Sequence, residues 1–521
     1  MDSDLKSLEF DGIRRLLERL ALTPYGADAA RNLEPAPSLA VARAMQQAVT
    51  ASRQVVDGYL LPRLGNVPDI RASLRQADQQ GAALSPSALT NLRVVMKIVL
   101  QLRELVAQFP ELYQNIGQLK APAALMEVLD KTISHAGRLK EDASPELADL
   151  HKQYVDIQKQ VENHLKELIR SPAYAGLFDD DAKPSWQGIR AVLTVRSVNA
   201  DKIKGVRRGT SGGGRDALVE PIEVVAHNNR LETLGGQIES QNQIVLRAVT
   251  DDVRAHLAEL EGAIDALTWI DLAFAAGQLS AAMNASAPAL VDAPVVRLNK
   301  AYHPQLMLQF MDKQISQIKP LTISLDESQP MMVITGPNTG GKTVVLKTVG
   351  LLTTMAHCGL HVPSDDLCEI GDFSRIIVDV GDKQSLHHHL STFAGHVEVL
   401  KRLLGEADDR TLVLMDELGT GTDPEEGASL AMAVLDELSS RKVHGIVTTH
   451  LSPLKGFADG HSYLTNASMR FDFENLSPTY ELEPGKAGQS LGLIIAEKNG
   501  LPSGLVEKAR GYLATLHPNG V

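Results

Sequence analysis

The sequence predicts an α/β domain of the P-loop type, joined to a mainly α-helical region that contains a small β-structured insertion. Three observations predict this combination. A glycine-rich segment at residues 336–343 follows an apolar strand and precedes an apolar helical pattern. From about Pro294 onward, expected strands alternate with expected helices, as in a parallel α/β sheet. Upstream, two long stretches with helical apolar spacing flank a basic, glycine-rich segment.

Composition indicates a soluble intracellular protein. The chain of 521 residues is long enough for about two to four domains, and its 44% hydrophobic and 22% charged residues are ordinary for globular proteins. The N-terminus is polar and acidic, so no signal peptide is expected, and no apolar run approaches the length of a membrane span. Its two cysteines, Cys358 and Cys368, exclude a disulfide framework and suit a reducing cytosol. We therefore expect a cytoplasmic protein without a membrane partner.

The region before the α/β domain reads as a helical scaffold with two arms. Residues 1–146 show mostly helical patterns punctuated by prolines, without a chemical motif. Apolar residues at three- and four-residue steps then predict two antiparallel helices, in the stretches Leu147, Leu150, Tyr154, Ile157, Val161, Leu165, Leu168 and Val249, Val253, Leu257, Leu260, Ile264, Leu267. We divide the chain into a first helical core and lever part (1–170), an insertion with a basic tip (171–229), a second lever part (230–293) and the P-loop domain (294–521).

The insertion concentrates positive charge. The net charge of −13 argues against a nucleic-acid partner, but between residues 190 and 215 the only acid is Asp201. Glycines at 209 and 212–214 let this segment approach a phosphate backbone closely. We expect the cluster to bind nucleic-acid phosphates, although a solvated loop is the alternative interpretation. The candidate nucleic-acid-binding residues are Arg196, Lys202, Lys204, Arg207, Arg208 and Arg215.

The glycine-rich segment predicts a nucleotide site. The run Gly336-Pro337-Asn338-Thr339-Gly340-Gly341-Lys342-Thr343 fits the pattern of glycine, four residues, then Gly-Lys-Thr. Small residues let backbone N–H groups close around phosphate oxygens, and the N-terminus of the following helix adds a favourable dipole. Lys342 is expected to reach the β- and γ-phosphates, and the Thr343 hydroxyl to ligate Mg²⁺. All eight residues are candidates for nucleotide binding.

A second motif predicts hydrolysis. The apolar strand at 411–415 ends in two carboxylates, Asp416 and Glu417. Asp416 is placed to hold Mg²⁺ through water, and Glu417 to polarise the attacking water. Taken alone, the segment is equally well interpreted as a buried strand that ends in two solvated acids. Downstream of a P-loop, the functional interpretation is favoured.

Three further features follow strands near these motifs. Gln384, in Gly381-Asp382-Lys383-Gln384-Ser385, is placed to reach Mg²⁺ or the lytic water. Ser391 or Thr392 is expected to cap a helix, and a capped helix N-terminus suits an anion. His450 ends the strand at 445–449 and is placed to face the γ-phosphate. Each feature alone has an ordinary structural explanation. The functional interpretation therefore depends on the order of the three features along the chain.

This order of motifs, at Thr335–Thr343, Leu390–Phe393, Met415–Pro424 and Thr448–His450, is that of the ABC-type ATPases. The motifs resemble the MutS family of mismatch-repair ATPases, and within it the shorter bacterial MutS-II branch. The segment Tyr302-His303-Pro304 resembles the family's Arg-His-Pro segment, with tyrosine in place of arginine. Further similar segments are Leu8–Asp11, Ala143–Leu147, Ser490–Gly492 with Ala496, and Gly500–Pro502.

The resemblance implies an ATPase that uses ATP and Mg²⁺ and works as a homodimer with two composite sites. Ser391 and Thr392 of one subunit would cap the γ-phosphate held by the P-loop of the other, and Asp423 would lie at the dimer contact. His303 would adjoin the bound nucleotide. The basic insertion would correspond to a clamp that embraces DNA, and ATP would open or close the clamps through the levers.

Departures from the family narrow the expected activity. The chain begins at the lever, without the family's mismatch-reading domain, and stops at Val521, where the branch usually continues into a nuclease domain. Base-reading mismatch recognition and nuclease activity are therefore not expected from this chain. The segment from Val206 to Gly214 is also less apolar than its family counterpart.

Two functions remain open. The first is a dimeric ATPase that clamps branched or damaged DNA in repair or recombination control. The second is an ATP-driven factor that binds ribosomes and splits collided ones, because phosphate attraction does not distinguish DNA from rRNA. A chromosome-organising ATPase would need longer helical arms, and a transporter subunit would have no use for a lever and clamp.

Overall fold

The protein forms two compact units, and each is described by itself. The computed structural model describes residues 2–58, 64, 66–174, 176–178, 183–336, 340–380, 392–472, 477–488, 492–498 and 500–516. Unit 1 comprises Met1–Asn66, Arg103–Ile116 and Asp265–Val521, and unit 2 comprises Val67–Leu102 and Gly117–Ile264. Within the described ranges, no helix combines the length and apolar character that a membrane-crossing segment needs.

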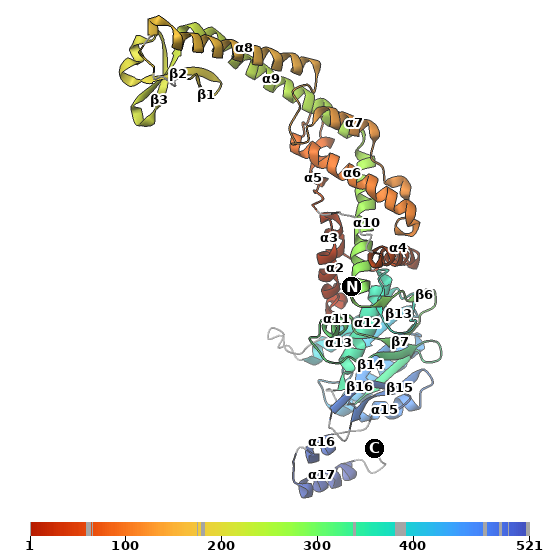
Figure 1. The fold of residues 1–521 in the computed structure, drawn as a ribbon. Coiled ribbons are helices and arrows are strands. Elements are labelled where there is room, and N and C mark those ends of the chain that lie inside the picture. The colour runs from red at the N-terminus through yellow and green to blue at the C-terminus, as the bar shows by residue number, and fades with distance from the viewer. Residues whose placement is uncertain are drawn as a thin grey trace. The chain divides into compact units, whose positions relative to one another are not determined.

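Unit 1 is built on a six-stranded sheet with the order β12-β13-β14-β9-β15-β16. Figure 1 labels four of these strands, β13, β14, β15 and β16. Its strands are β9 (Met331–Thr335), β12 (Arg375–Asp379), β13 (Thr411–Met415), β14 (His444–Thr449), β15 (Leu464–Asp472) and β16 (Ser477–Pro484). Neighbours from β12 to β15 pair in parallel, and β16 pairs antiparallel with β15. The predicted parallel α/β sheet is confirmed, and the predicted strands at 411–415 and 445–449 agree with β13 and β14 within one residue at either end.

Residues along the central strands alternate between two apolar cores. In β9, Met332 and Ile334 join the core that includes α12 (Lys342–His357), while Met331 and Val333 join the core on the opposite face. That second core includes residues of α13 (Thr392–Glu406), α14 (Pro424–Ser440) and α15 (Ser452–Asp459). Burial on both faces explains why these strands are continuous apolar runs without a polar alternation.

Smaller elements complete unit 1. The short strands are β5 (Ala285–Ser286), β6 (Ala289–Val291), β7 (Val296–Ala301), β8 (Leu321–Leu325), β10 (Val362–Pro363) and β11 (Glu369–Gly371). The helices are α1 (Asp2–Ser7), α2 (Phe10–Leu20), α3 (Pro24–Arg31), α4 (Leu39–Asp57), α11 (Pro304–Met311), α16 (Gly492–Lys498) and α17 (Ser503–Leu516). Two long helices, α6 (Pro86–Gln108) and α10 (Leu257–Ala282), contribute residues to both units.

The N-terminal helices pack directly on the P-loop region. The buried Asp4 carboxylate accepts the N–H of Val378, which lies on the edge strand β12, and pairs with Arg402 of α13 at 2.6 Å. A Cβ atom on Gly350 of α12 would lie 2.4 Å from the Leu8 side chain, so the glycine makes room for Leu8 at this contact. Helix α1 therefore covers an otherwise open sheet edge. Sequence patterns alone gave no sign of this packing.

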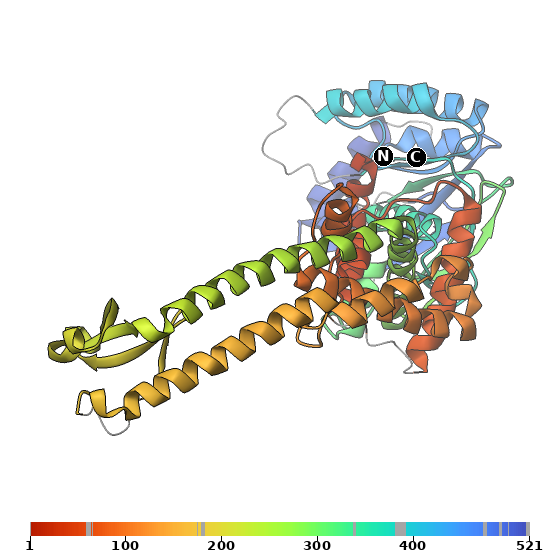
Figure 2. The same cartoon turned by 90° about the horizontal axis from the view of Figure 1, so that it is seen from above.

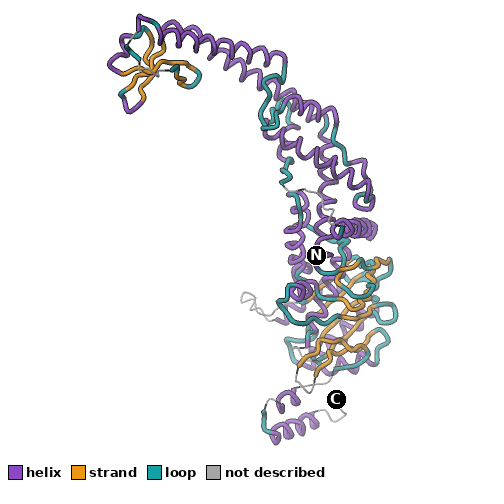
Figure 3. The backbone as a smooth tube through the Cα atoms, viewed as in Figure 1, coloured by secondary structure: helices purple, strands orange, loops and turns teal. Residues whose placement is uncertain are grey.

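Unit 2 consists of helices and one four-stranded sheet. Its helices besides α6 and α10 are α5 (Arg71–Asp78), α7 (Ala123–Thr132), α8 (Pro145–Arg170) and α9 (Ile222–Ala255). The strands β1 (Ser185–Gln187), β2 (Arg190–Arg196), β3 (Gly205–Ser211) and β4 (Asp216–Pro221) have the order β1-β2-β4-β3. Figure 2 shows α8 and α9 side by side, and Figure 3 shows the strands at the end of this helix pair. We call β1–β4 and the turns between them, residues 185–221, the tip sheet.

The partner of α8 differs from the predicted one. Val161 and Leu165 of α8 share a core with Val224 and Leu231, which lie in the first half of α9. The predicted partner stretch begins at Val249, whose part of α9 packs beside α5. The predicted stretch from Val249 to Leu267 covers the end of α9 and the start of α10, so the residues of α9 that pack on α8 precede it.

Candidate functional site

The carboxyl ends of adjacent parallel strands bring the sequence motifs together. Strand β9 leads into Gly336, β13 into Asp416 and β14 into His450. In the sheet, β14 lies between β13 and β9, with Met415 opposite Val447 and Thr335 opposite Thr449. Ligand sites of open α/β sheets form at this edge.

The P-loop has the backbone that a phosphate cradle requires. Gly336 has φ 131° and Gly341 has φ 93°, and both values favour glycine over residues with a side chain. Helix α12 starts at Lys342, directly after Gly341. The N-terminus of α12 therefore lies where the sequence places the phosphates. Pro337, Asn338 and Thr339 lie outside the described residues, and their assignments stay predictions.

Lys342 lies next to both carboxylates of the second motif. Its side chain is buried, and its ammonium donates a hydrogen bond to the Gly336 carbonyl oxygen. Burial lowers the pKa of Lys342, while the negative charges of Asp416 and Glu417 act in the opposite direction. The ammonium is thus held against the P-loop itself.

Two hydroxyls hold the Asp416 carboxylate. The Thr343 hydroxyl donates to Asp416 Oδ2 at 2.6 Å, and the Thr448 hydroxyl donates to Asp416 Oδ1. The Thr448 hydroxyl oxygen also accepts the backbone N–H of Glu417 at 2.9 Å. Thr448 therefore fixes both acids, although the sequence analysis assigned it no role. The signal that could have identified Thr448 is its position near the end of β14, beside the strand that leads into Asp416.

The donor set of this site fits Mg²⁺. The Thr343 hydroxyl and the Asp416 carboxylate are hard oxygen ligands placed side by side at the start of α12. Mg²⁺ is usually held by one or two protein oxygens together with substrate phosphates and water. The residues present therefore suit a Mg²⁺–nucleotide complex.

Glu417 adopts a strained backbone. Its φ of 54° is in the left-handed region, which costs about 1–3 kcal/mol for a residue with a side chain. Two hydrogen bonds to Thr448 hold this conformation. The Thr448 hydroxyl oxygen accepts the Glu417 N–H, and the Thr448 carbonyl oxygen accepts the Leu418 N–H at 3.0 Å. A strained residue just after β13 is typical of a functional position.

The remaining predicted groups are only partly described. His450 is exposed and directly follows β14, at the same edge of the sheet as Asp416. Gln384 and Ser391 lie outside the described residues. Thr392 starts α13, but its side chain is outside the described part of the chain. The catalytic and capping roles of these four residues stay predictions.

A cavity of about 980 Å³ lies next to the P-loop helix. His303, Gly341, Val344 and Thr348 contribute to its wall. Burial lowers the pKa of His303 to about 4, so its imidazole is neutral at pH 7. Sequence reasoning missed the other apolar and aromatic lining residues, which include Leu306, Ile315, Ile318, Met469, Phe471 and Tyr480. They come from segments without a motif, so no local pattern marked them.

Comparison with known proteins shows a domain match and several relatives of this chain. Residues 332–517 match the family model of MutS domain V. Across 98% of its length, the chain is 34% identical to the endonuclease MutS2 of Pelotomaculum thermopropionicum and 32% identical to that of Bacillus velezensis. It is 31% identical to the putative endonuclease MutS2 of Bacillus subtilis, again across 98% of the chain.

The chain contains MutS domain V and is homologous to MutS2 proteins along almost its whole length. The resemblance inferred from the motifs is therefore confirmed. The chain spans 65% of the length of each of these three relatives. Their shared name, MutS2, matches the branch that the motifs indicated.

The basic residues predicted from the sequence lie together on the tip sheet. Arg196 ends β2, Lys202 and Lys204 lie between β2 and β3, Arg207 and Arg208 lie on β3, and Arg215 precedes β4. All six are exposed. Residues 185–221 contain seven basic and three acidic side chains. The tip sheet is thus a positively charged surface on an acidic protein.

Arg208 differs from the others because it pairs inward. Its Nε donates to Glu220 Oε2 at 2.5 Å, and Arg190 bonds the other carboxylate oxygen at 2.8 Å. Glu220 is fully buried, and burial raises the pKa of its carboxyl group. The pKa nevertheless lies below its usual value, because Asn228 and Arg208 donate hydrogen bonds to the carboxylate and Arg190 adds a positive charge. A β-bulge between Arg207 and Gly209 accompanies this inward turn. We therefore assign Arg208 a part in the folding of the tip sheet, and its contact with nucleic acid stays a prediction.

Replacing Arg208 by alanine should accordingly destabilise the tip sheet by about 1–3 kcal/mol, because it removes a bond to a buried carboxylate. Replacing Arg207 should cost less than about 0.5 kcal/mol, as for other exposed side chains. Trp186 of β1 reports on this region once Trp269, the other tryptophan, is changed to phenylalanine. Equal urea midpoints of Trp186 fluorescence in the two arginine variants would contradict the assignment.

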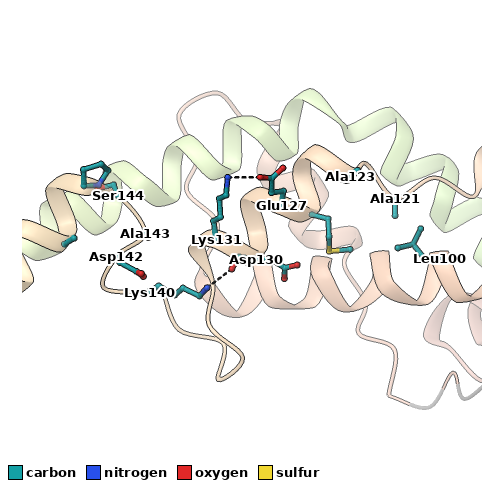
Figure 4. A pocket seen from close by; sticks show the side chains of 13 residues that line it. Leu100, Ala121, Ala123, Glu127, Asp130, Lys131, Lys140, Asp142, Ala143 and Ser144 are labelled. Atoms are coloured by element: carbon teal, nitrogen blue, oxygen red, sulfur yellow. Dashed lines mark hydrogen bonds and ion pairs between the residues drawn. The ribbon is translucent and has the colours of Figure 1, made fainter.

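Unit 2 also has a shallow hollow of about 870 Å³, lined by residues of α6, α7 and the start of α8 (Figure 4). The side chains of its two lysines bond to neighbouring protein groups. Lys131 pairs with Glu127 at 2.8 Å, and Lys140 donates to the Asp130 carbonyl oxygen at 2.7 Å. The hollow therefore has no cluster of polar groups that converges on a ligand among the residues drawn.

Proposed function

We propose that this chain is a MutS-family ATPase that hydrolyses ATP to control the clamping of a homodimer on branched or damaged DNA in repair or recombination control. One observation carries the catalytic part. Thr343, Asp416, Glu417 and Thr448 are linked by hydrogen bonds at the N-terminus of the P-loop helix. This arrangement suits a triphosphate with its metal ion and an attacking water.

Each residue has a defined task in this reaction. Lys342 would bind the β- and γ-phosphates in place of the Gly336 carbonyl, and Thr343 and Asp416 would hold Mg²⁺, which would neutralise phosphate charge. Glu417 orients and polarises the water that attacks the γ-phosphate. The adenine base of ATP would occupy the cavity beside His303, because a neutral imidazole suits contact with an uncharged heterocycle. His450 and Gln384 would complete the site around the γ-phosphate.

A second subunit completes the site in this proposal. Ser391 and Thr392 would approach the γ-phosphate of the partner, and Asp423, which caps α14 by accepting the N–H groups of Glu425 and Glu426, would lie at the contact. Exposed apolar side chains on α17, such as Leu505 and Tyr512, support self-association. ATP then acts by stabilising the closed dimer more than the open one.

The tip sheet supplies the nucleic-acid contact. Replacing Lys202, Lys204 and Arg207 by glutamine should weaken binding to a four-way DNA junction and reduce the slope of log K against log salt by about three. Fluorescence anisotropy across a series of salt concentrations measures both quantities. ATPase activity without DNA should stay at the wild-type level.

The matched control removes the same charge elsewhere in unit 2. Lys152, Lys159 and Lys166 are exposed on α8, outside the tip sheet. If the control triple variant lowers the salt slope as much as the tip variant, the tip sheet is not the contact. Parallel binding to purified ribosomes tests the substrate, because retention on ribosomes without affinity for the junction would overturn the DNA assignment.

A further inference from the structure

Asp379, the last residue of β12, contacts two parts of the proposed site at once. Its carbonyl oxygen accepts the backbone N–H of Asp416 at 2.9 Å. Its carboxylate oxygen Oδ2 lies 2.8 Å from Nδ1 of His396, which donates the hydrogen bond from α13. One residue therefore joins the main chain of the proposed Mg²⁺ ligand to the helix that follows the predicted Ser391-Thr392 motif.

The bond between Asp379 and His396 is shielded from water. The two side chains are 19% and 21% exposed. Helix α13 has a second anchor further along, where Arg402 pairs with the buried Asp4 at 2.6 Å. Two fixed points on one helix set both its position and its rotation, so α13 cannot shift without disturbing β12.

We propose that Asp379 and His396 form a positioning pair that holds Asp416 in its Mg²⁺-binding place and couples it to α13. The inference rests on the proposed ATPase function. Without the bond, the end of β12 is held among the described residues only by its pairing with β13 and by Asp4, so the Asp416 amide is positioned less firmly. Partners of a metal ligand typically contribute 10–100-fold to metal affinity or activity.

The variants His396→Ala and Asp379→Ala test the pair. Each should lower kcat at least about tenfold and raise the Mg²⁺ concentration for half-maximal activity by a similar factor. Binding of a fluorescent ATP analogue in EDTA should be unchanged, because the P-loop is intact. The double variant should lose no more than either single variant, since the two residues act through one bond. His396→Gln, which keeps an N–H donor, should recover part of the activity.

Hydrogen exchange in the nucleotide-free protein gives a readout that does not depend on activity. Amides of α13 should exchange faster in His396→Ala than in wild type. Lys401→Ala is the control, because it removes only an exposed pair with Glu398 on the same helix. Lys401→Ala should change neither kcat nor exchange.

The outcomes separate this inference from the proposed function. A wild-type protein without ATP hydrolysis would overturn both. A wild type that hydrolyses ATP and is inactivated by Glu417→Gln, with His396→Ala unchanged in kcat, Mg²⁺ requirement and exchange, would overturn the positioning pair alone. Additive losses in the double variant, together with weaker nucleotide binding in EDTA, would also overturn it, because they indicate general destabilisation.

Discussion

Replacing Glu417 by glutamine is expected to lower kcat for ATP hydrolysis about a thousandfold while ATP stays bound. Glutamine keeps the size and the left-handed backbone but cannot accept a proton from the attacking water. Lys342, Thr343 and Asp416, which hold the triphosphate and Mg²⁺, are untouched. The variant should therefore accumulate the ATP-bound dimer.

Steady-state phosphate release measures the loss, and light scattering with ATP and Mg²⁺ measures the dimer. Glu425→Gln is the matched control, because Glu425 is an exposed carboxylate on α14 with the same chemical change. Glu425→Gln should hydrolyse ATP at the wild-type rate. Unchanged turnover in Glu417→Gln would overturn the role assigned to Glu417.

Replacing Thr448 by valine is expected to lower kcat about a hundredfold. Valine has nearly the same shape but cannot donate to Asp416 or accept from the Glu417 N–H, the two bonds that Thr448 makes. Both acids would then lose their fixed geometry. The unsatisfied Glu417 N–H should also cost about 1–3 kcal/mol of stability.

The neighbouring threonine separates catalysis from stability. Thr449 is equally buried, and its hydroxyl bonds the Leu418 carbonyl oxygen and the Leu451 N–H instead of the acids. Thr449→Val should destabilise the protein without a comparable loss of kcat, and Thr448→Ser should retain most activity. Equal kcat losses in the two valine variants would show that Thr448 has no special role.

The parts of the site that the sequence predicted are those whose chemistry is local. The P-loop and the pair Asp416-Glu417 are recognisable because strand, turn and ligand-binding residues are adjacent in sequence. The parallel sheet followed from apolar runs of strand length that end at these motifs. In each case, one short segment contains both the structural pattern and the functional groups.

The parts that the sequence missed depend on residues that are distant in sequence. Thr448 fixes Asp416 only because β14 lies beside β13, and Tyr480 lines the cavity only because β16 closes the sheet edge. The charge of Arg208 counted toward the basic cluster, but the buried Glu220 compensates it. Helical periodicity identified α8 but not its partner, because an amphipathic face does not specify what covers it.

The most direct test of this account is whether ATP at the P-loop changes binding at the tip sheet. The measurement is the Kd of Glu417→Gln for a four-way DNA junction at fixed salt, with and without ATP and Mg²⁺. The account predicts at least about a fivefold change in Kd, which is the usual lower range for coupled sites. The same change should be lost when Lys202, Lys204 and Arg207 are also neutralised. An identical Kd with and without bound ATP would contradict the coupling between the two sites.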